Sequence, residues 1–128
     1  MNRRIAMGLA LLAGVAIGAT AINGLHAQNK SPGAYAVVDI SEVTDPEGFK
    51  AIGPIAGPAA EKVGGKYIVR TNNITALDGT APKRFVVIAF DSVEKAKAWN
   101  DSADQKQVDA VRTKTTKSRV FIVEGMAN

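Results

Sequence analysis

The chain has 128 residues, no cysteine, one histidine and a formal net charge of +4, from 16 basic and 12 acidic residues. The lack of cysteine excludes disulfides and thiol nucleophiles, so stability must come from packing. The charge of +2 that remains without the N-terminal Arg3 and Arg4 gives no reason to expect a nucleic-acid partner, which favours clustered lysine and arginine with stacking aromatic residues.

Residues 1–27 carry the pattern of a secretory signal peptide. Arg3 and Arg4 precede an uncharged apolar run from Ile5 to Ile22, and Ala27 precedes a polar residue. The arginines stay on the cytoplasmic side while the apolar run enters the bilayer. We therefore expect cleavage after Ala27 and a periplasmic or secreted protein that is no longer attached to the membrane. Two alternatives stay open, cleavage after Ala21 and retention of the run as an inner-membrane anchor.

Removal of the signal leaves a polar linker at residues 28–33 and a domain at residues 34–128. About 100 residues suffice for one hydrophobic core and leave no room for a second domain. Loss of Arg3 and Arg4 lowers the formal charge to +2, since 16 − 2 = 14 basic residues remain against 12 acidic ones.

The single histidine, His26, lies within the signal, so the mature protein has neither histidine nor cysteine. This excludes a Ser-His-Asp triad, histidine-ligated haem and zinc held by its usual ligands. We expect no cofactor and no metal. Acid–base chemistry is left to Asp, Glu, Lys, Tyr, Arg and hydroxyl groups.

The domain opens with a strand and a broken helix. Residues 34–41 (AYAVVDIS) are apolar and rich in β-branched residues, which predicts the first strand. A helix should start at Asp45-Pro46-Glu47, with the aspartate as N-cap and the proline at the first helical position. Prolines 54 and 58 should split this helix, and Gly64-Gly65 should end it.

The second half of the domain contains three further strands and two helices. Residues 66–73 (KYIVRTNN) and 84–90 (RFVVIAF) predict the second and third strands, joined by an irregular connection. Ser92 can cap a short helix, and Ser102 opens an S-x-x-Q capping box that predicts another helix. Residues 120–124 (VFIVE) predict the fourth strand.

This order, β-α-β-β-α-β, predicts an α+β fold of the ferredoxin-like type, a four-stranded antiparallel sheet with helices on one face. A sheet wetted on its other side should alternate apolar and polar residues. In the third strand, however, Phe85 and Val87 fall on one face and Val86 and Ile88 on the other. We therefore expect a homodimer in which the uncovered faces pack together. A monomer with one exposed apolar face is the alternative.

Three segments resemble the DUF1330 family: AYAVVDISEVTDPEGF, RFVVIAFDSVEKAKAWNDS and the terminal VFIVEG. The resemblance covers nearly all of residues 34–125. It implies membership of the dimeric α+β barrel superfamily, with two sheets packed face to face around a small cavity. That superfamily includes cofactor-free monooxygenases, whereas the family itself has no established common activity. The sequence departs from the family pattern at Asn100, where a tyrosine is usual.

Five residues are candidates for a site. Asp39, in an otherwise apolar strand, is a candidate general base, and Arg70 a candidate electrostatic partner that orients an anionic substrate. Tyr35, Trp99 and Asn100 are candidate pocket residues. Four of them have a structural alternative: an ion pair between Asp39 and a basic residue such as Arg70, and core packing for Tyr35 and Trp99.

Three functions are consistent with these features. The first is binding of a small apolar or anionic molecule in a dimer cavity. The second is a cofactor-independent oxygenase or isomerase that uses Asp39 as base, and the third is a structural or interaction protein without a pocket. They differ in whether Asp39 and Arg70 face an open cavity together.

Overall fold

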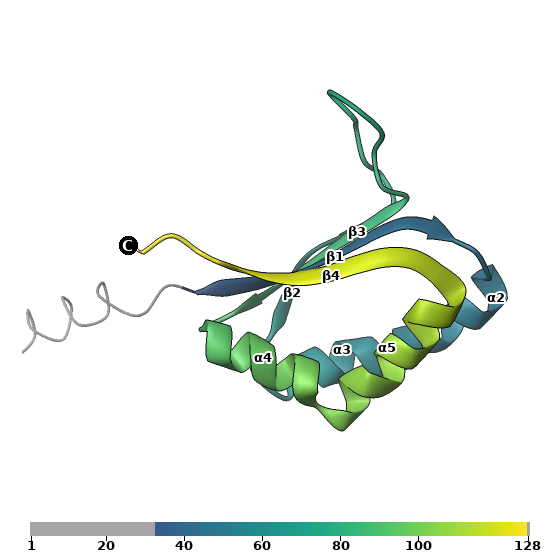
Figure 1. Ribbon diagram of the computed structural model, residues 1–128. Helices are drawn as coiled ribbons and strands as arrows, with labels where there is room; N and C mark the ends of the chain where they lie inside the picture. The colour runs from purple at the N-terminus through teal and green to yellow at the C-terminus, as the bar shows by residue number, and fades with distance from the viewer. Residues whose placement is uncertain (1–32, 128) are drawn as a thin grey trace, which may run out of the picture. The chain divides into compact units, whose positions relative to one another are not determined.

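The computed structural model describes residues 33–127 (Figure 1), and the predicted signal peptide, its cleavage site and the linker up to residue 32 lie outside these residues. In chain order the elements are β1 (Ala34–Val43), α2 (Pro46–Phe49), η1 (Lys50–Ile52), α3 (Gly53–Glu61), β2 (Lys66–Thr71), β3 (Arg84–Phe90), α4 (Val93–Asp101), α5 (Ala103–Thr115) and β4 (Thr116–Glu124).

The four strands form one antiparallel sheet in the order β2-β3-β1-β4. The helices lie together on one side of it (Figure 1). This confirms the predicted ferredoxin-like α+β fold, in which each helical segment connects two strands that follow one another in sequence but are not neighbours in the sheet.

The helices begin and break where the sequence predicts. The side chain of Asp45 accepts a hydrogen bond from the backbone N–H of Gly48 at the start of α2, at 3.1 Å. The proline-containing segment is divided into α2, η1 and α3, because proline removes a backbone donor and crowds the preceding turn. Ser102 separates α4 from α5, and its hydroxyl accepts from the backbone N–H of Gln105 at 3.2 Å.

Strand boundaries differ from the prediction at three places. β1 continues to Val43, and β4 begins at Thr116, because the two strands pair as far as Val43 and Thr116. β2 ends at Thr71 rather than Asn73, where its pairing with β3 stops. Tertiary pairing, which local propensity does not contain, sets all three ends.

The hydrophobic core lies between the sheet and the helices. Its largest fully buried side chains are Trp99 and Ile88, and the rings of Trp99 and Phe90 have their centroids 5.6 Å apart. Gly65 lies beneath Phe90, where an added Cβ would come within 2.7 Å of the ring. The other core residues are Ala34, Ala36, Ala59, Ala60, Val86 and Ala96.

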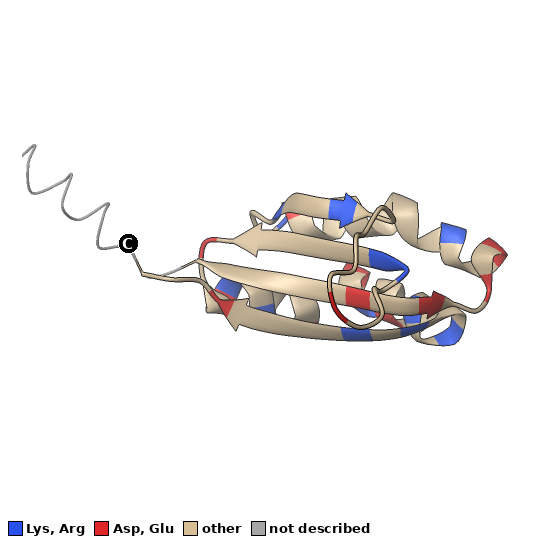
Figure 2. Cartoon of the chain, turned by 90° about the horizontal axis from the view of Figure 1, so that it is seen from above, with Lys and Arg blue, Asp and Glu red and all other residues tan. Residues whose placement is uncertain are grey.

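The opposite side of the sheet, which we call the free face, is also apolar over most of its area. Figure 2 looks onto it and shows the strands side by side with the helices behind them. Its central row across the strands is Phe121, Val37, Val87 and Val69. Phe121 is 41% exposed and Val69 37%. The prediction that both faces are apolar is therefore confirmed, and no helix of residues 33–127 covers the free face.

Candidate functional site

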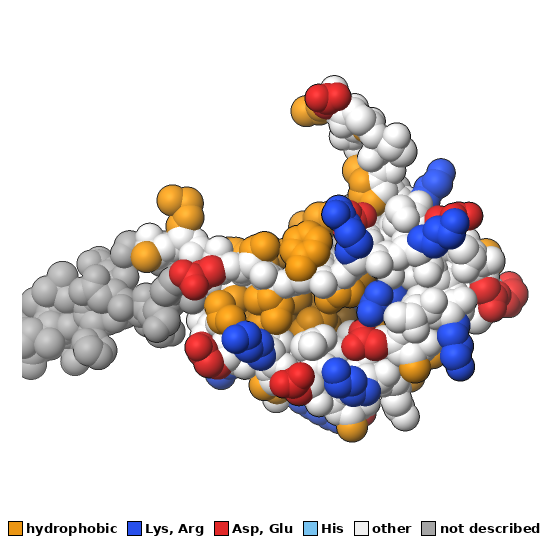
Figure 3. Space-filling model, viewed as in Figure 1, with side chains coloured by type: hydrophobic (Ala, Val, Ile, Leu, Met, Phe, Trp, Pro, Cys, Tyr) orange, Lys and Arg blue, Asp and Glu red, His pale blue; other side chains and the backbone are white. Residues whose placement is uncertain are grey.

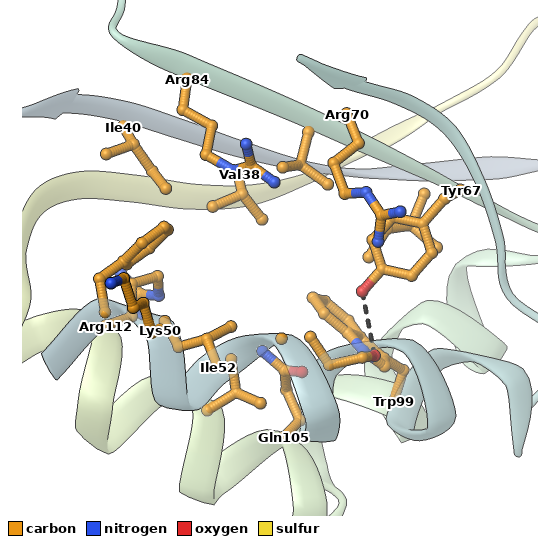
Figure 4. Close-up of a pocket in the computed structure, with 16 residues that line it drawn as sticks. Val38, Ile40, Lys50, Ile52, Tyr67, Arg70, Arg84, Trp99, Gln105 and Arg112 are labelled. Carbon is orange, nitrogen blue, oxygen red and sulfur yellow. Dashed lines mark hydrogen bonds between the residues drawn. The ribbon is translucent and has the colours of Figure 1, made fainter. Parts of the chain in front are cut away.

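A pocket of about 290 Å³ opens between the helix-covered face of the sheet and the helices α2, α3 and α5 (Figure 4). Its walls are mainly apolar, and its polar residues are four cations, a tyrosine and a glutamine. The lining residues are Val38, Ile40, Phe49, Lys50, Ile52, Gly53, Ala56, Tyr67, Arg70, Arg84, Val86, Ile88, Trp99, Gln105, Val108 and Arg112. None of these lining residues is acidic, so the pocket favours an anion.

Arg70 and Arg84 reach over the pocket from the two neighbouring strands β2 and β3 (Figure 4). Arg70 is on the pocket side because the pairing of β2 with β3 shifts between Tyr67 and Val69, as at a β-bulge. The extra residue turns the strand, so that Arg70 is opposite Val86 and shares a face with Tyr67. A regular strand would have directed Arg70 to the free face.

Neither of these two arginines forms an ion pair with a carboxylate in residues 33–127. The Nη1 of Arg84 donates to the Oδ1 of Asn72 at 2.9 Å. The guanidinium carbon of Arg70 lies 5.3 Å from the centroid of the Tyr67 ring, a cation–π arrangement. Both contacts are with neutral groups, so the two positive charges remain available to a ligand.

The other two cations of the pocket already have acidic partners. Arg112 donates to Asp109 at 3.2 Å and to the hydroxyl of Ser118 at 2.8 Å. Lys50 pairs with Glu47 at 3.1 Å, and both side chains are largely exposed. These two residues therefore add less to the attraction of an anion than Arg70 and Arg84 do.

Tyr67 lines the pocket as an uncharged side chain. Its hydroxyl donates to the backbone oxygen of Ala56 at 3.0 Å, shown as the dashed line in Figure 4. Burial raises the pKa of Tyr67 above its ordinary value of 10, and the neighbouring Arg70 partly opposes this shift. The tyrosine is therefore protonated at neutral pH and acts as a hydrogen-bond donor rather than a base.

Trp99 on α4 and Gln105 on α5 line the pocket from the helix side (Figure 4). Trp99 is 1% exposed and packs in the core as well as lining the cavity. Gln105 is buried, and its amide donates to Asp109 at 3.2 Å. Ser102, between them in the chain, holds the helix break in place by donating its hydroxyl to the Trp99 carbonyl at 2.7 Å.

The structure separates the two predicted catalytic residues. Asp39 lies on the free face, where its carboxylate accepts a hydrogen bond from Arg119 at 2.6 Å. Arg70 lies on the opposite face and lines the pocket. One protomer thus does not bring Asp39 and Arg70 into a common site, and the ion pair of Asp39 is with Arg119 rather than Arg70. The reason is the alternation of side chains along β1, combined with the bulge in β2.

The three predicted pocket residues are also divided between the faces. Trp99 lines the pocket, Tyr35 lies on the free face opposite Ala89 and Val123, and Asn100 is half-buried outside the pocket lining. The pocket is on the helix-covered side of the sheet, whereas the expected dimer cavity lies on the free face.

Sequence reasoning missed Arg84, Arg112 and Gln105 as pocket residues. The sequence does contain a signal for Arg84: it is two and four residues from Val86 and Ile88, so it lies on the same strand face as these apolar residues. Arg112 and Gln105 lie on α5, whose orientation toward the sheet depends on the helix break at Ser102.

No set of three or more His, Cys, Asp or Glu side chains in the described part of the chain is arranged to hold a metal ion. Among the same residues, no helix has both the length and the apolar character needed to cross a membrane.

A family model described as "Domain of unknown function (DUF1330)" matches residues 33–126. No curated protein matches the chain. Among solved structures, the RPA0582 protein of unknown function from Rhodopseudomonas palustris is 15% identical, with a TM-score of 0.60, over 84% of this chain and 92% of that one.

Two further structures are similar in fold. A dimeric ferredoxin-like protein of unknown function from Thermobifida fusca is 14% identical, with a TM-score of 0.56, over 74% of this chain and 92% of that one. SnoaB, a cofactor-independent oxygenase from Streptomyces nogalater, is 7% identical, with a TM-score of 0.55, over 77% of this chain and 97% of that one. At these identities the similarity concerns the fold.

Proposed function

The chain belongs to the DUF1330 family of domains of unknown function, and we propose that its domain binds a small organic anion with an apolar body in the pocket between sheet and helices. The observation that carries the proposal is the pair Arg70 and Arg84, which face an apolar cavity without a carboxylate partner. Arg70 is exposed and Arg84 half-buried, so both charges stay hydrated in the empty pocket and can be reached by an anion from solution.

The geometry favours a carboxylate. The planar guanidinium presents two parallel N–H donors that match the two oxygens of a carboxylate, and charge-assisted hydrogen bonds of this kind contribute about 1.5–3 kcal/mol each. The apolar residues below, including Val86 and Ile88, suit a hydrocarbon body. A volume of about 290 Å³ is at the lower end of ordinary ligand pockets, which favours a single-ring or short-chain acid.

A titration that uses the single tryptophan as reporter tests this proposal, because Trp99 lines the pocket. Benzoate and hexanoate serve as probes, and benzyl alcohol is the uncharged control. We expect a saturable change in Trp99 fluorescence with the acids and a much weaker one with the alcohol. The double variant Arg70→Gln/Arg84→Gln should weaken acid binding at least tenfold.

A matched variant separates local from overall charge. Lys83 is exposed and lies outside the pocket lining, so Lys83→Gln should leave binding of the acids unchanged. Absence of any saturable response, both in fluorescence and in the amide chemical shifts of pocket residues, would refute the proposed binding function.

A cofactor-independent oxygenase is the second candidate, supported by the similarity of fold to SnoaB. The lining of the pocket contains no carboxylate to act as base, which makes simple binding the better supported function. Oxygen consumption during incubation with a bound acid distinguishes the two. Consumption that depends on Arg70 and Arg84 would favour the oxygenase.

We also propose that the protein is a homodimer whose free faces pack together. The exposed apolar side chains of this face include Tyr35, Val69, Phe121 and Val123, each between 36% and 41% exposed. Burial of such surface stabilises an interface by about 25 cal/mol per Å². Light scattering of residues 28–128 should give the mass of two chains, and a monomer mass at micromolar concentration would contradict the proposal.

Export remains part of the proposal and rests on residues 1–27. Arg3, Arg4 and the apolar run that follows support it. In cells that express the full-length chain we expect the protein in the periplasmic or secreted fraction with Gln28 as its first residue. A full-length protein in the membrane fraction would instead identify an uncleaved anchor.

A further inference from the structure

A long arm joins β2 to β3. Residues 72–83, which we call the arm, connect two antiparallel neighbours, a connection that usually needs two to five residues. Figure 1 shows the arm rising from the sheet on the side opposite the helices, and Figure 2 shows it in front of the strands. The arm is therefore on the same side as the free face.

Only the base of the arm is held by hydrogen bonds to the domain. The backbone N–H of Lys83 donates to the carbonyl of Ile40 at 2.8 Å, and Asn72 accepts from Arg84. Residues 74–82 form no hydrogen bond with any other residue of the range 33–127. The backbone groups of the outer arm are open to water or to a partner.

The tip of the arm combines an apolar and an acidic residue. Leu77 is 96% exposed, and the chain turns at Asp78-Gly79, where Gly79 has a φ of 74° that favours glycine. In Figure 3 the arm is clear of the rest of the domain, with hydrophobic and acidic side chains at its tip. A single exposed leucine is ordinary, but Leu77 lies on the same side of the sheet as the exposed apolar residues of the free face.

We infer that the arm clasps a second copy of this chain and that Leu77 is buried against the partner subunit when two free faces pack together. The inference rests on the homodimer of the proposed function. Packed sheets are about 10 Å apart, whereas half of the arm spans up to about 20 Å at roughly 3.3 Å per residue. Each arm is thus long enough to pass the edge of the partner's sheet, and twofold symmetry makes the contact reciprocal.

The charges favour a second copy over another kind of partner. Two sheets that pack face to face are related by a twofold axis lying between them, and this axis can run perpendicular or parallel to the strands. A perpendicular axis brings the arm to the end of the partner's β2 that carries Lys66. A parallel axis brings it to the end of the partner's β4 that carries Arg119. In the first case the acidic Asp78 approaches Lys66, which has no ion pair among residues 33–127, and in the second it approaches Arg119, which already pairs with Asp39 of its own chain.

Sedimentation measurements of the dimer dissociation constant test the inference on residues 28–128, which contain the whole core. We expect Leu77→Ala to raise the constant at least tenfold, and the matched arm variant Thr75→Ala to leave it within twofold. Replacement of residues 74–81 by an Asn-Gly turn should raise it further. If Leu77→Ala and the shortened variant both had the dimer dissociation constant of the wild type, the arm contact would be overturned and the homodimer would stand.

Cross-linking provides a direct second measurement, since the chain has no cysteine. A benzophenone attached to Leu77→Cys should give a covalent dimer on illumination, whereas one attached to Ala98→Cys, exposed on α4, should not. A dimer that cross-links from neither position would overturn the inference. A wild-type protein that is monomeric at all concentrations would instead refute the proposed homodimer, and the arm contact with it.

Discussion

Arg84 and Asn72 connect the pocket to the base of the arm through one hydrogen bond, from Nη1 to Oδ1 at 2.9 Å. The guanidinium of Arg84 lines the pocket, while Asn72 is the first residue of the arm. The neutral amide orients the arginine without cancelling its charge. A ligand carboxylate can then meet a guanidinium that is already in place, which reduces the entropy lost on binding.

We predict that Asn72→Ala weakens benzoate binding about 3- to 10-fold, because loss of one orienting hydrogen bond is worth roughly 1 kcal/mol. Asn73→Ala is the matched control, since no side-chain hydrogen bond of Asn73 occurs in the described residues. Equal effects of the two substitutions on the Trp99 titration would show that Asn72 does not position Arg84.

Trp99 should dominate the stability of the helix layer. It is 1% exposed and packs against Phe90, so Trp99→Ala is expected to cost about 3–5 kcal/mol, while Trp99→Phe should cost less because the cavity it leaves is smaller. Urea unfolding followed by circular dichroism measures both changes. A cost below about 1 kcal/mol for Trp99→Ala would mean that the ring is not part of the core.

The raised pKa of Tyr67 predicts a loss of stability in alkaline solution. In the unfolded chain the phenol ionises near pH 10, whereas burial raises its pKa in the folded protein. The unfolded state therefore holds fewer protons above pH 10. The stabilisation from neutral Tyr67 is complete below pH 10 and is lost as the pH rises through the folded-state pKa.

Urea unfolding at pH 9 and pH 11 tests this expectation, with Tyr67→Phe as comparison. Lysines also titrate in this range, so the informative quantity is the difference between wild type and variant. The wild type should lose more stability than Tyr67→Phe between the two values. Parallel losses would mean that the phenol titrates alike in both states.

Asp39→Asn should change little. The Asp39 side chain is 16% exposed, but its partner Arg119 is 75% exposed, and an ion pair open to water on one side contributes about 1 kcal/mol. We expect a loss of stability below about 1 kcal/mol and no change in benzoate affinity, since Asp39 lies outside the pocket. Weaker benzoate binding by Asp39→Asn would contradict this prediction and would mean that the Asp39 carboxylate contributes to the binding site.

Local rules predicted most of the elements. Asp45 and Ser102 cap helices, and the prolines divide the first helical segment, because each effect acts within a few residues of the chain. The strand Arg84–Phe90 has its predicted bounds, since it is β-rich and pairs on both sides.

The site could be predicted only in part. Trp99 and Arg70 do line a pocket, but Asp39 and Arg70 are on opposite faces of the sheet, because the pairing of β2 with β3 shifts between Tyr67 and Val69 and turns Arg70 toward the helices. A bulge depends on the register with the neighbouring strand, which spacing along one strand does not reveal.

By itself, the sequence determined the α+β order, the two apolar sheet faces and the absence of histidine and cysteine from residues 28–128, because composition and periodicity are properties of the chain alone. The tertiary structure decided which cations share the pocket, that Asp39 faces away from it, and that residues 72–83 rise over the free face. These three features depend on strand register and on the packing of segments far apart in the sequence, and such contacts are set only when the whole sheet forms.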